Sequence, residues 1–262
     1  MKKLLLLTIV FTLTFGGCKK KKENDEDPLS PSQEQRGFAI NYTAKWCGPC
    51  GNWGAPLIHH YADEAPDGAI ICAHAAGDPM NNGLYSSFRN DRTTNGGIPS
   101  FWVGDTFTQS NNAMNSLLNQ SAIAGVDYRY SIDGNTIKVD TKVKFFDNGQ
   151  GDYYLSVIIL EDGIPGDSST GDYAQSGTSQ SYPNDDYHHD FVLRASSVQG
   201  EAYGEKITTN PSSGSEEDNS YSIDIESGWN KDNIYPVCII WKYDSSGQYP
   251  RYKYINSLKK KN

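Results

Sequence analysis

The pattern of apolar and polar positions changes near residue 124, and the later part of the chain alternates with a period of two. Between Ile137 and Phe145, apolar residues and one threonine occupy every second position, and lysine or aspartate fills the positions between. This alternation is typical of an antiparallel strand with one buried face. Further strand-length runs lie at 127–132, 153–160, 190–194, 221–225, 234–241 and 251–255. Short strands with no helical pattern among them predict an all-β, sandwich-like domain over residues 124–257.

The earlier part of the chain mixes strand-length and helix-length patterns. Trp53, Leu57 and Tyr61 recur at the spacing of one helix face, and the apolar run 37–42 that precedes them has the length of a strand. The other predicted elements of this part are a strand at 69–75, a helix at 80–92, a strand at 98–103 and a helix at 111–122. Strands that alternate with helices indicate an α/β domain, which we place at residues 35–122.

The first 17 residues predict export of the protein. Lys2 and Lys3 precede an apolar run, Leu4 to Phe15, that is short for a permanent membrane helix and typical of a signal peptide. The run ends Phe-Gly-Gly-Cys, which resembles the lipobox of bacterial lipoproteins. The resemblance implies that residues 1–17 are removed and that Cys18 is lipidated, so that the mature chain is anchored to a membrane through its lipid.

The segment that follows the predicted anchor is charged and contains almost no apolar residue. Residues 18–34 therefore cannot bury enough surface to offset their ordering entropy, and they predict a flexible tether. The whole chain has a formal net charge of −9. This acidic balance argues against nucleic acid and against anionic lipid surfaces as partners.

The chain has five cysteines, and their surroundings assign them to different roles. Cys18 belongs to the predicted lipid anchor, and Cys47 and Cys50 form a CxxC pair. Cys72 and Cys238 lie in apolar runs and are expected to be buried strand residues. They could form a disulfide with each other only if the two predicted domains abut there. A single CxxC falls short of the two ligand pairs that a structural zinc site requires, so we expect no metal and no other cofactor.

The CxxC pair carries the candidate chemistry. It follows a predicted strand directly and opens a predicted helix, so its cysteines occupy positions i and i+3 of the first helical turn. Cys47 then lies at the helix N-terminus, where unpaired N–H groups and the helix dipole favour a thiolate. Cys50 lies one turn deeper and can attack a mixed disulfide. We therefore expect Cys47 to attack the substrate and Cys50 to resolve the intermediate.

The sequence WCGPC, followed about fifty residues later by an Ile-Pro step into a strand, resembles the thioredoxin fold. This resemblance implies that the proline is cis and lies against the redox pair. It also implies that the residues beside the pair and the proline form a substrate groove: Trp46, Gly48, Pro49, Ile98 and Pro99. The fold class that we expect is an α/β thioredoxin-like domain followed by an all-β sandwich-like domain.

Two positions depart from the thioredoxin pattern. Asn41 stands where that family carries a buried aspartate six residues before the first cysteine, so proton transfer from Cys50 would need water or another group such as His74. Pro56 follows Cys50 by six residues rather than five, which changes where the helix bends beside the pair. We expect the first departure to slow disulfide exchange without abolishing it.

Motifs along most of the mature chain resemble the Omp-twenty-eight-related family of outer-membrane lipoproteins. They are the lipobox, WCGPC, HAAGDPM at 74–80, LEDGI at 160–164 and HDFVLR at 189–194. The resemblance implies a lipid-anchored outer-membrane protein with a thioredoxin-like first part and a β-rich second part. Phe191 replaces the second histidine of that family's HNHVLR motif. His188 and His189 would point to opposite faces of a strand, so they are not expected to share a metal ion.

Two functions remain open from the sequence. The first is an extracytoplasmic thiol–disulfide oxidoreductase of the reductase or isomerase type, with disulfide-containing exported proteins as substrates and a membrane electron donor as a further partner. The second is a surface-binding or adhesion lipoprotein, in which the CxxC is a structural disulfide and the β-rich part binds glycan or protein. The leaflet that holds the anchor, the periplasmic face or the cell surface, is open as well.

Overall fold

The computed structural model describes residues 27–93, 96–178 and 186–260. The predicted signal peptide and lipidated Cys18 lie outside the described residues. Within the described part, no helix combines the length and apolarity that a membrane crossing requires. In chain order, the elements are β1 (Phe38–Thr43), η1 (Cys50–Gly54), α1 (Ala55–Glu64), β2 (Ala69–His74), α2 (Gly83–Asp91), β3 (Ser100–Val103), β4 (Thr106–Phe107), α3 (Ala113–Leu118), β5 (Ala124–Asp133), β6 (Thr136–Phe145), β7 (Asp152–Glu161), β8 (Ile164–Pro165), η2 (Ser168–Tyr173), β9 (His188–His189), β10 (Val192–Ser196), β11 (Glu205–Thr209), β12 (Glu216–Asp224), β13 (Ile234–Tyr243) and β14 (Tyr252–Lys259).

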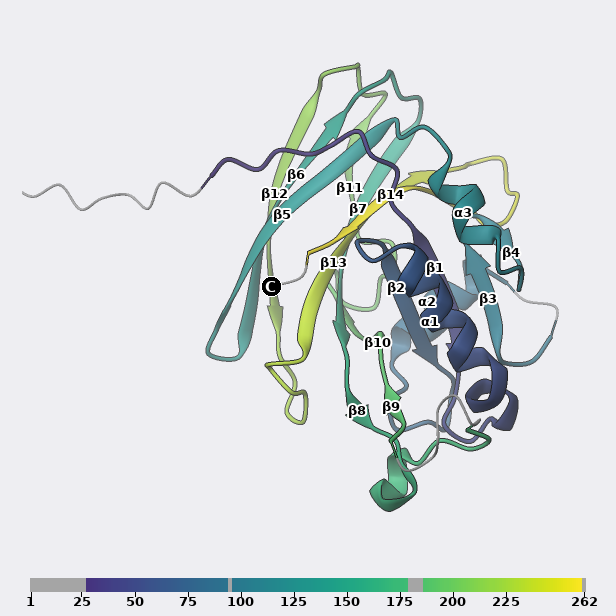
Figure 1. The fold of residues 1–262 in the computed structure, drawn as a ribbon. Helices are drawn as coiled ribbons and strands as arrows, with labels where there is room; N and C mark the ends of the chain where they lie inside the picture. The colour runs from purple at the N-terminus through teal and green to yellow at the C-terminus, as the bar shows by residue number, and fades with distance from the viewer. Residues whose placement is uncertain (1–26, 94–95, 179–185, 261–262) are drawn as a thin grey trace, which may run out of the picture.

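One nine-stranded mixed sheet runs through the molecule in the order β14-β13-β7-β10-β2-β1-β3-β4, with β11 also paired to β7 (Figure 1). Strand β1 pairs in parallel with β2 and antiparallel with β3. Strand β10 closes the gap between the two halves, because Val192 pairs in parallel with Cys72 of β2. The N–H of Cys72 donates to the carbonyl of Phe191 at 2.7 Å. Both halves of the chain therefore contribute to the same sheet.

The expected fold class, an α/β thioredoxin-like domain followed by an all-β sandwich-like domain, is wrong. The structure is β-rich, and the strands before residue 123 continue the same sheet as strands after it, with the two groups joined where β2 meets β10. The physical reason is that β2 is an interior strand of the sheet and not an edge strand. Its backbone groups are paired with β10, which comes from residues 192–196. Periodicity shows which residues are strands, but it carries no information about which strand edges pair.

The individual strands were predicted more successfully than their arrangement. Each of the strand runs predicted between residues 124 and 257 overlaps an observed strand, namely β5, β6, β7, β10, β12, β13 and β14. Strand β11 (Glu205–Thr209) was not predicted, because its residues are exposed or half-buried and show no apolar alternation. The helix predicted at 111–122 is shorter in the structure, where α3 spans Ala113–Leu118.

A second, three-stranded sheet in the order β12-β6-β5 packs against one face of the large sheet. Side chains of β13 show the two faces clearly. Cys238 and Ile240 contribute to the core shared with the small sheet, whereas Val237, Ile239 and Trp241 contribute to the core that also contains α1, α2 and α3 residues. A strand buried on both faces has apolar residues at consecutive positions. This explains the continuous apolar runs in β7 and β13.

The described end of the predicted tether is held against the body of the protein. The Ser30 N–H donates to the carboxylate of Asp127 in β5 at 2.8 Å. The side chain of Asn256 in β14 accepts from the Arg36 N–H at 2.8 Å and donates to the Glu34 carbonyl at 2.9 Å. These contacts fix the point at which the chain enters β1.

Candidate active site around Cys47 and Cys50

The two cysteines of the CxxC pair form a disulfide at the carboxyl end of β1. A turn between β1 and the first helix carries Cys47, whose N–H donates to the Ala44 carbonyl at 3.1 Å. Cys47 is 6% exposed and Cys50 is 2% exposed, whereas the neighbouring Trp46 is 52% exposed. Cys47 is therefore the more exposed cysteine of the pair, and the exposed aromatic side chain of Trp46 lies next to it in the sequence.

The helix that follows is already helical at Gly48 and Pro49, passes through a π-helical turn, η1, that begins at Cys50, and continues directly into α1. A π turn accommodates one more residue than an α turn, and such turns occur frequently at functional sites. The extra residue between Cys50 and Pro56 is absorbed here. The Cys50 N–H points at the Cys47 sulfur at 3.2 Å. In the reduced protein, an N–H in this position favours the thiolate form of Cys47.

The Ile98–Pro99 step faces the first sulfur. Its peptide bond is cis, as the thioredoxin resemblance implied. The Cys47 sulfur lies 3.5 Å from the Ile98 carbonyl oxygen. Gly54 of η1 allows this approach, because a Cβ at that position would lie 2.9 Å from the Pro99 Cβ. The structure thus brings together residues predicted from two distant segments of the chain.

A small polar cavity of about 10 Å³ lies behind Cys50. This volume has room for about one water molecule. The Asn41 side chain, which is 2% exposed, lines the cavity, and within the described part of the chain its Oδ1 has no hydrogen-bond partner. The other lining residues that bear on proton transfer are Thr43, His59, Cys72, His74, His189 and Asp190. A buried amide oxygen without a partner is costly, so a water in this cavity would satisfy it.

His74 is the best-placed base in the cavity wall. Its Nδ1 lies 2.9 Å from the Asp78 carboxylate, and both side chains are buried. Burial opposes ionisation of Asp78, but hydrogen bonds from His74, Lys45 and Met80 together lower its pKa. Because an ionised carboxylate only accepts, Nδ1 carries the hydrogen, and Nε2 is an acceptor whenever the ring is unprotonated. The sequence run HAAGDPM contained this pair, but only the structure shows that the two side chains meet.

His188 and His189 point to opposite sides of β9, and only His189 is buried. The His189 Nε2–H donates to the Tyr173 carbonyl at 2.8 Å, and its ring packs edge-on against His74 at 5.4 Å between centroids. Burial, reinforced by the positive charge of a protonated His74, lowers the pKa of His189 to about 4. Among the residues that the structure describes, no group of three or more His, Cys, Asp or Glu side chains is arranged to hold a metal ion.

Acid is expected to destabilise the fold through His189. The unfolded chain binds a proton at this histidine below its ordinary pKa of 6.5, whereas the folded protein does so only near pH 4. The stability contribution of the neutral ring is therefore present above about pH 6.5 and is lost as the pH falls toward 4, by about 3 kcal/mol at most. Urea denaturation at a series of pH values between 7 and 4 measures the slope of the free energy of unfolding against pH.

The neighbouring histidine supplies the control for this experiment. His189→Gln keeps a side-chain donor for the Tyr173 carbonyl and should flatten the slope between pH 6.5 and 4. His188→Gln, at an exposed position, should leave the slope unchanged. An identical pH dependence in wild type and His189→Gln would show that other groups, such as the neighbouring His74 and Asp78, cause the acid sensitivity.

Cys72 and Cys238 are free thiols buried in different cores. They do not form a disulfide with each other. Burial raises the pKa of both thiols, which keeps them protonated and unreactive. Cys72 shares the small cavity with Cys50, but its strongly desolvated thiol is a poor nucleophile.

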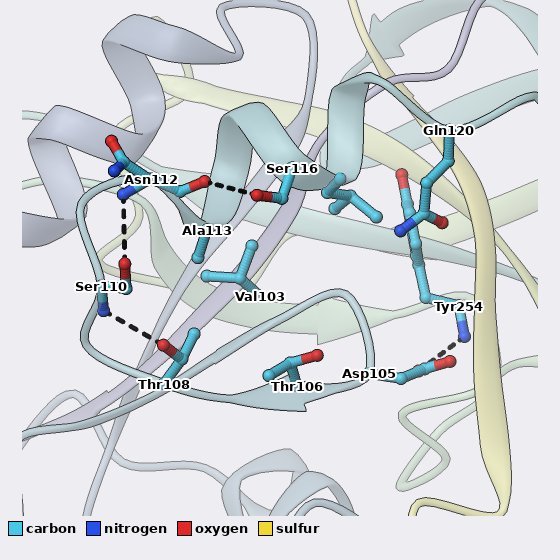
Figure 2. A pocket seen from close by; sticks show the side chains of 11 residues that line it. Val103, Asp105, Thr106, Thr108, Ser110, Asn112, Ala113, Ser116, Gln120 and Tyr254 are labelled. Carbon is cyan, nitrogen blue, oxygen red and sulfur yellow. Dashed lines mark hydrogen bonds between the residues drawn. The ribbon is translucent and has the colours of Figure 1, made fainter.

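A larger pocket of about 370 Å³ lies near α3 and the β3–β4 turn (Figure 2). Its lining includes Val103 and Asp105, at the end of β3 opposite to the end that follows Pro99. Thr108, Ser110 and Asn112 contribute to its wall. The Thr108 hydroxyl accepts from the Ser110 backbone N–H, and the Ser110 hydroxyl accepts from the Asn112 backbone N–H. The pocket contains none of the residues predicted for the redox site.

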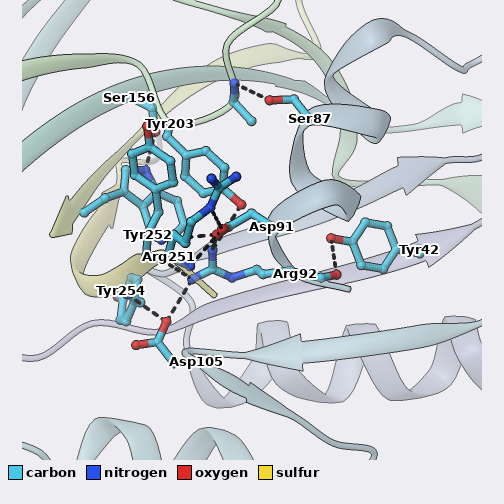
Figure 3. Close-up of polar contacts among 12 residues, drawn as sticks. Tyr42, Ser87, Asp91, Arg92, Asp105, Ser156, Tyr203, Arg251, Tyr252 and Tyr254 are labelled. Atoms are coloured by element: carbon cyan, nitrogen blue, oxygen red, sulfur yellow. Dashed lines mark hydrogen bonds and ion pairs between the residues drawn. The ribbon is translucent and has the colours of Figure 1, made fainter. Parts of the chain in front are cut away.

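A buried polar cluster around Arg92 joins the two halves of the chain (Figure 3). The Arg92 guanidinium is fully buried and donates to Asp105 at 2.9 Å and to the Tyr252 carbonyl at 2.9 Å. It also donates to the Tyr203 hydroxyl at 3.2 Å and lies 4.6 Å from the ring centroid of Trp241. These partners come from the β3–β4 turn, β14, the segment before β11, and β13. The cluster is therefore a structural tie between the two halves and shares no residue with the CxxC site.

Comparisons with known proteins agree with this β-rich arrangement. No curated protein matches the sequence. Among solved structures, HBP35 of Porphyromonas gingivalis is similar in fold with a TM-score of 0.66 and 13% sequence identity, over 87% of this chain and 75% of that chain. Residues 100–250, more than half of the chain, match the family described as Outer membrane protein Omp28. The chain therefore belongs to the Omp28 family, which places it at the outer membrane of the cell envelope.

Proposed function

We propose that this chain is an extracytoplasmic thiol–disulfide oxidoreductase of the reductase or isomerase type. The observation that carries the proposal is the asymmetry of the pair. The Cys47 sulfur lies at a helix start, 3.2 Å from the Cys50 N–H, on the residue with the greater exposure. Cys50 is nearly fully buried and faces a polar cavity. This asymmetry supports a division of roles in which Cys47 meets the substrate and Cys50 exchanges a proton inside the protein.

In the reduced protein, the Cys47 thiolate attacks a substrate disulfide. One substrate sulfur leaves as a thiolate and takes a proton from solvent, and a mixed disulfide joins Cys47 to the other. Cys50 then loses its proton and attacks the Cys47 sulfur, which releases the second substrate thiolate and forms the Cys47–Cys50 disulfide. A dithiol donor restores the reduced pair by the same two exchanges, and in the envelope this donor would be a membrane electron-transfer protein.

His74 is the proposed acceptor for the Cys50 proton. Its ring lines the same cavity as Cys50, and its Nε2 is the acceptor left by the hydrogen bond to Asp78. A water in the cavity would connect the Cys50 thiol, the Asn41 amide oxygen and this ring. The amide of Asn41 cannot itself take a proton, so the proton continues to the imidazole. His74 thus supplies the base that position 41 lacks.

The anchor and the substrates complete the proposal. Lipidation of Cys18 would hold the protein on the membrane, with residues that follow it as a spacer. Disulfide-containing exported proteins would then be the substrates. Trp46 supports a role in substrate contact, because exposed aromatic side chains next to a reactive group often anchor a partner.

A redox titration of the purified protein tests the proposal. Dithiothreitol buffers set the potential, and thiol alkylation followed by mass spectrometry reports the state of Cys47 and Cys50. We expect a reversible midpoint between about −180 and −280 mV, the range of working oxidoreductases. A pair that stays oxidised below about −300 mV would be a structural disulfide and would contradict the proposal.

The second candidate is a surface-binding lipoprotein whose CxxC is structural. It is favoured by the low exposure of the pair, since both cysteines are less than a tenth exposed in the oxidised protein. In this case the function would lie in the β-rich part, where glycan or protein would bind. The same redox titration separates the two candidates.

A further inference from the structure

The loop between β8 and β9 reaches the CxxC turn from the other half of the chain. Residues 174–178, which we call the cap, follow η2 and lie at the same end of the fold as the start of η1 (Figure 1). The Ser176 N–H donates to the Lys45 carbonyl at 2.7 Å. The Gln175 side chain, on a residue that is 4% exposed, donates to the Cys47 carbonyl at 3.1 Å and lies 3.4 Å from the Ala44 carbonyl.

Glycines allow the cap to approach this closely. Gly177 adopts a φ of +74°, and a Cβ on it would lie 2.2 Å from the Gly48 carbonyl oxygen. A Cβ on Gly51 would lie 2.3 Å from the Ser176 carbonyl oxygen. The two backbones are therefore in direct contact at the dipeptide that separates the cysteines and at the residue that follows them. Gly48 of WCGPC, predicted to line a substrate groove, is half-buried and contacts the cap through its backbone.

The cap is attached to its own half of the protein at its base. The Gln175 N–H donates to the Gly166 carbonyl at 2.9 Å, and the residue at the end of η2, Tyr173, accepts from His189. On the CxxC side, its hydrogen bonds likewise go to backbone carbonyls, those of residues 44–47. Such bonds contribute little each in net terms, because water replaces them when they open. The cap therefore fits the CxxC turn closely, and we expect the contact to open at a modest cost in free energy.

We propose that the cap sets the substrate class of the redox pair, an inference that rests on the proposed function. With the cap seated, Cys47 is 6% exposed, and we expect a low-molecular-weight disulfide to reach it more readily than a disulfide held on a folded protein. A disulfide on a folded protein must bring a surface against the turn that carries Cys47, and the cap occupies that turn at Lys45, Cys47 and Gly48. Exchange with protein disulfides therefore requires release of the cap, and Gln175 and Gly177 determine how often this occurs.

Single-turnover exchange with two substrates tests this inference. The protein is reduced with dithiothreitol, desalted, and mixed with either oxidised glutathione or insulin, and loss of the Cys47 thiol is followed by alkylation and mass spectrometry. Gly177→Ala places a methyl group against Gly48, and Gln175→Ala removes the side-chain donor. Both variants should react about tenfold faster with insulin, and within about twofold of wild type with glutathione.

Gly200→Ala is the matched control. Gly200 has a φ of +78°, close to that of Gly177, but a Cβ there would meet no described atom within 4 Å. It imposes the same backbone strain without touching the cap, and should change neither rate. Equal acceleration with both substrates, or none with insulin in either cap variant, would overturn the inference while leaving the proposed function intact. A wild-type protein that reacts with neither substrate would overturn both.

Discussion

Serine in place of Cys50 is expected to leave Cys47 joined to its substrate in a stable mixed disulfide. The Cys47 thiolate keeps the Cys50 backbone N–H at 3.2 Å, because the substitution changes only the side chain. The second exchange then lacks its nucleophile, so the intermediate accumulates. Non-reducing electrophoresis and mass spectrometry of envelope fractions would detect adducts linked through Cys47. Cys47→Ser should form none, and its exchange rate should fall to the uncatalysed background.

The same assay tests the roles assigned to Cys72, which should take no part, and to His74, which should act as the base. Cys72→Ser, in combination with Cys50→Ser, should leave the adducts unchanged, since the Cys72 thiol is buried and its pKa is raised. His74→Gln in the wild-type background should slow release of the mixed disulfide by about a hundredfold while leaving its formation unchanged, because a general base contributes about this much. Adducts that persist without Cys47, or a His74→Gln variant that releases at the wild-type rate, would refute these assignments.

Methionine in place of Arg92 is expected to cost about 3–5 kcal/mol of unfolding free energy, because it removes a fully buried charge that pairs with the buried Asp91 and the partly exposed Asp105 and that donates to the Tyr252 carbonyl. Asp105 and Asp91 both lie within ion-pair distance of the guanidinium, at 2.9 and 3.5 Å. Trp241 loses a cation 4.6 Å from its ring centroid as well. Urea denaturation followed by tryptophan fluorescence measures the change, and the melting temperature should fall by about 10 °C or more.

Arg129→Met is the control for this prediction. The Arg129 side chain is 45% exposed and pairs with Asp140 at 3.3 Å on the surface of the small sheet. Exposed pairs contribute about 1 kcal/mol or less, so this variant should unfold near the wild-type urea concentration. Similar losses in the two variants would mean that Arg92 does not tie the halves together, and that the sheet itself carries the connection.

Much of the local structure was predictable, because it depends on neighbours in the sequence. The alternation from Ile137 to Phe145 placed β6, and the strand, turn and helix pattern around Cys47 placed the redox pair at a helix start. The helix that carries Cys50, however, contains a π turn, which accommodates the one extra residue between Cys50 and Pro56 relative to the thioredoxin pattern. Strand β11 was missed because its sequence shows no apolar alternation, and its strand structure comes from its pairing with β7.

The sequence by itself indicated most of the longer strands, the position of the cysteine pair that forms the disulfide, and the apolar surroundings of Cys72 and Cys238. Only the tertiary structure decided that β10 joins β2, so that an expected pair of domains shares one sheet. It also decided that Asp78 orients His74 behind Cys50, and that Gln175 and Gly177 cover the turn in front of it. The reason is physical. The periodicity of apolar residues shows which face of a strand or helix is buried. The pairing of strand edges depends instead on backbone N–H and C=O groups, which almost every residue carries alike.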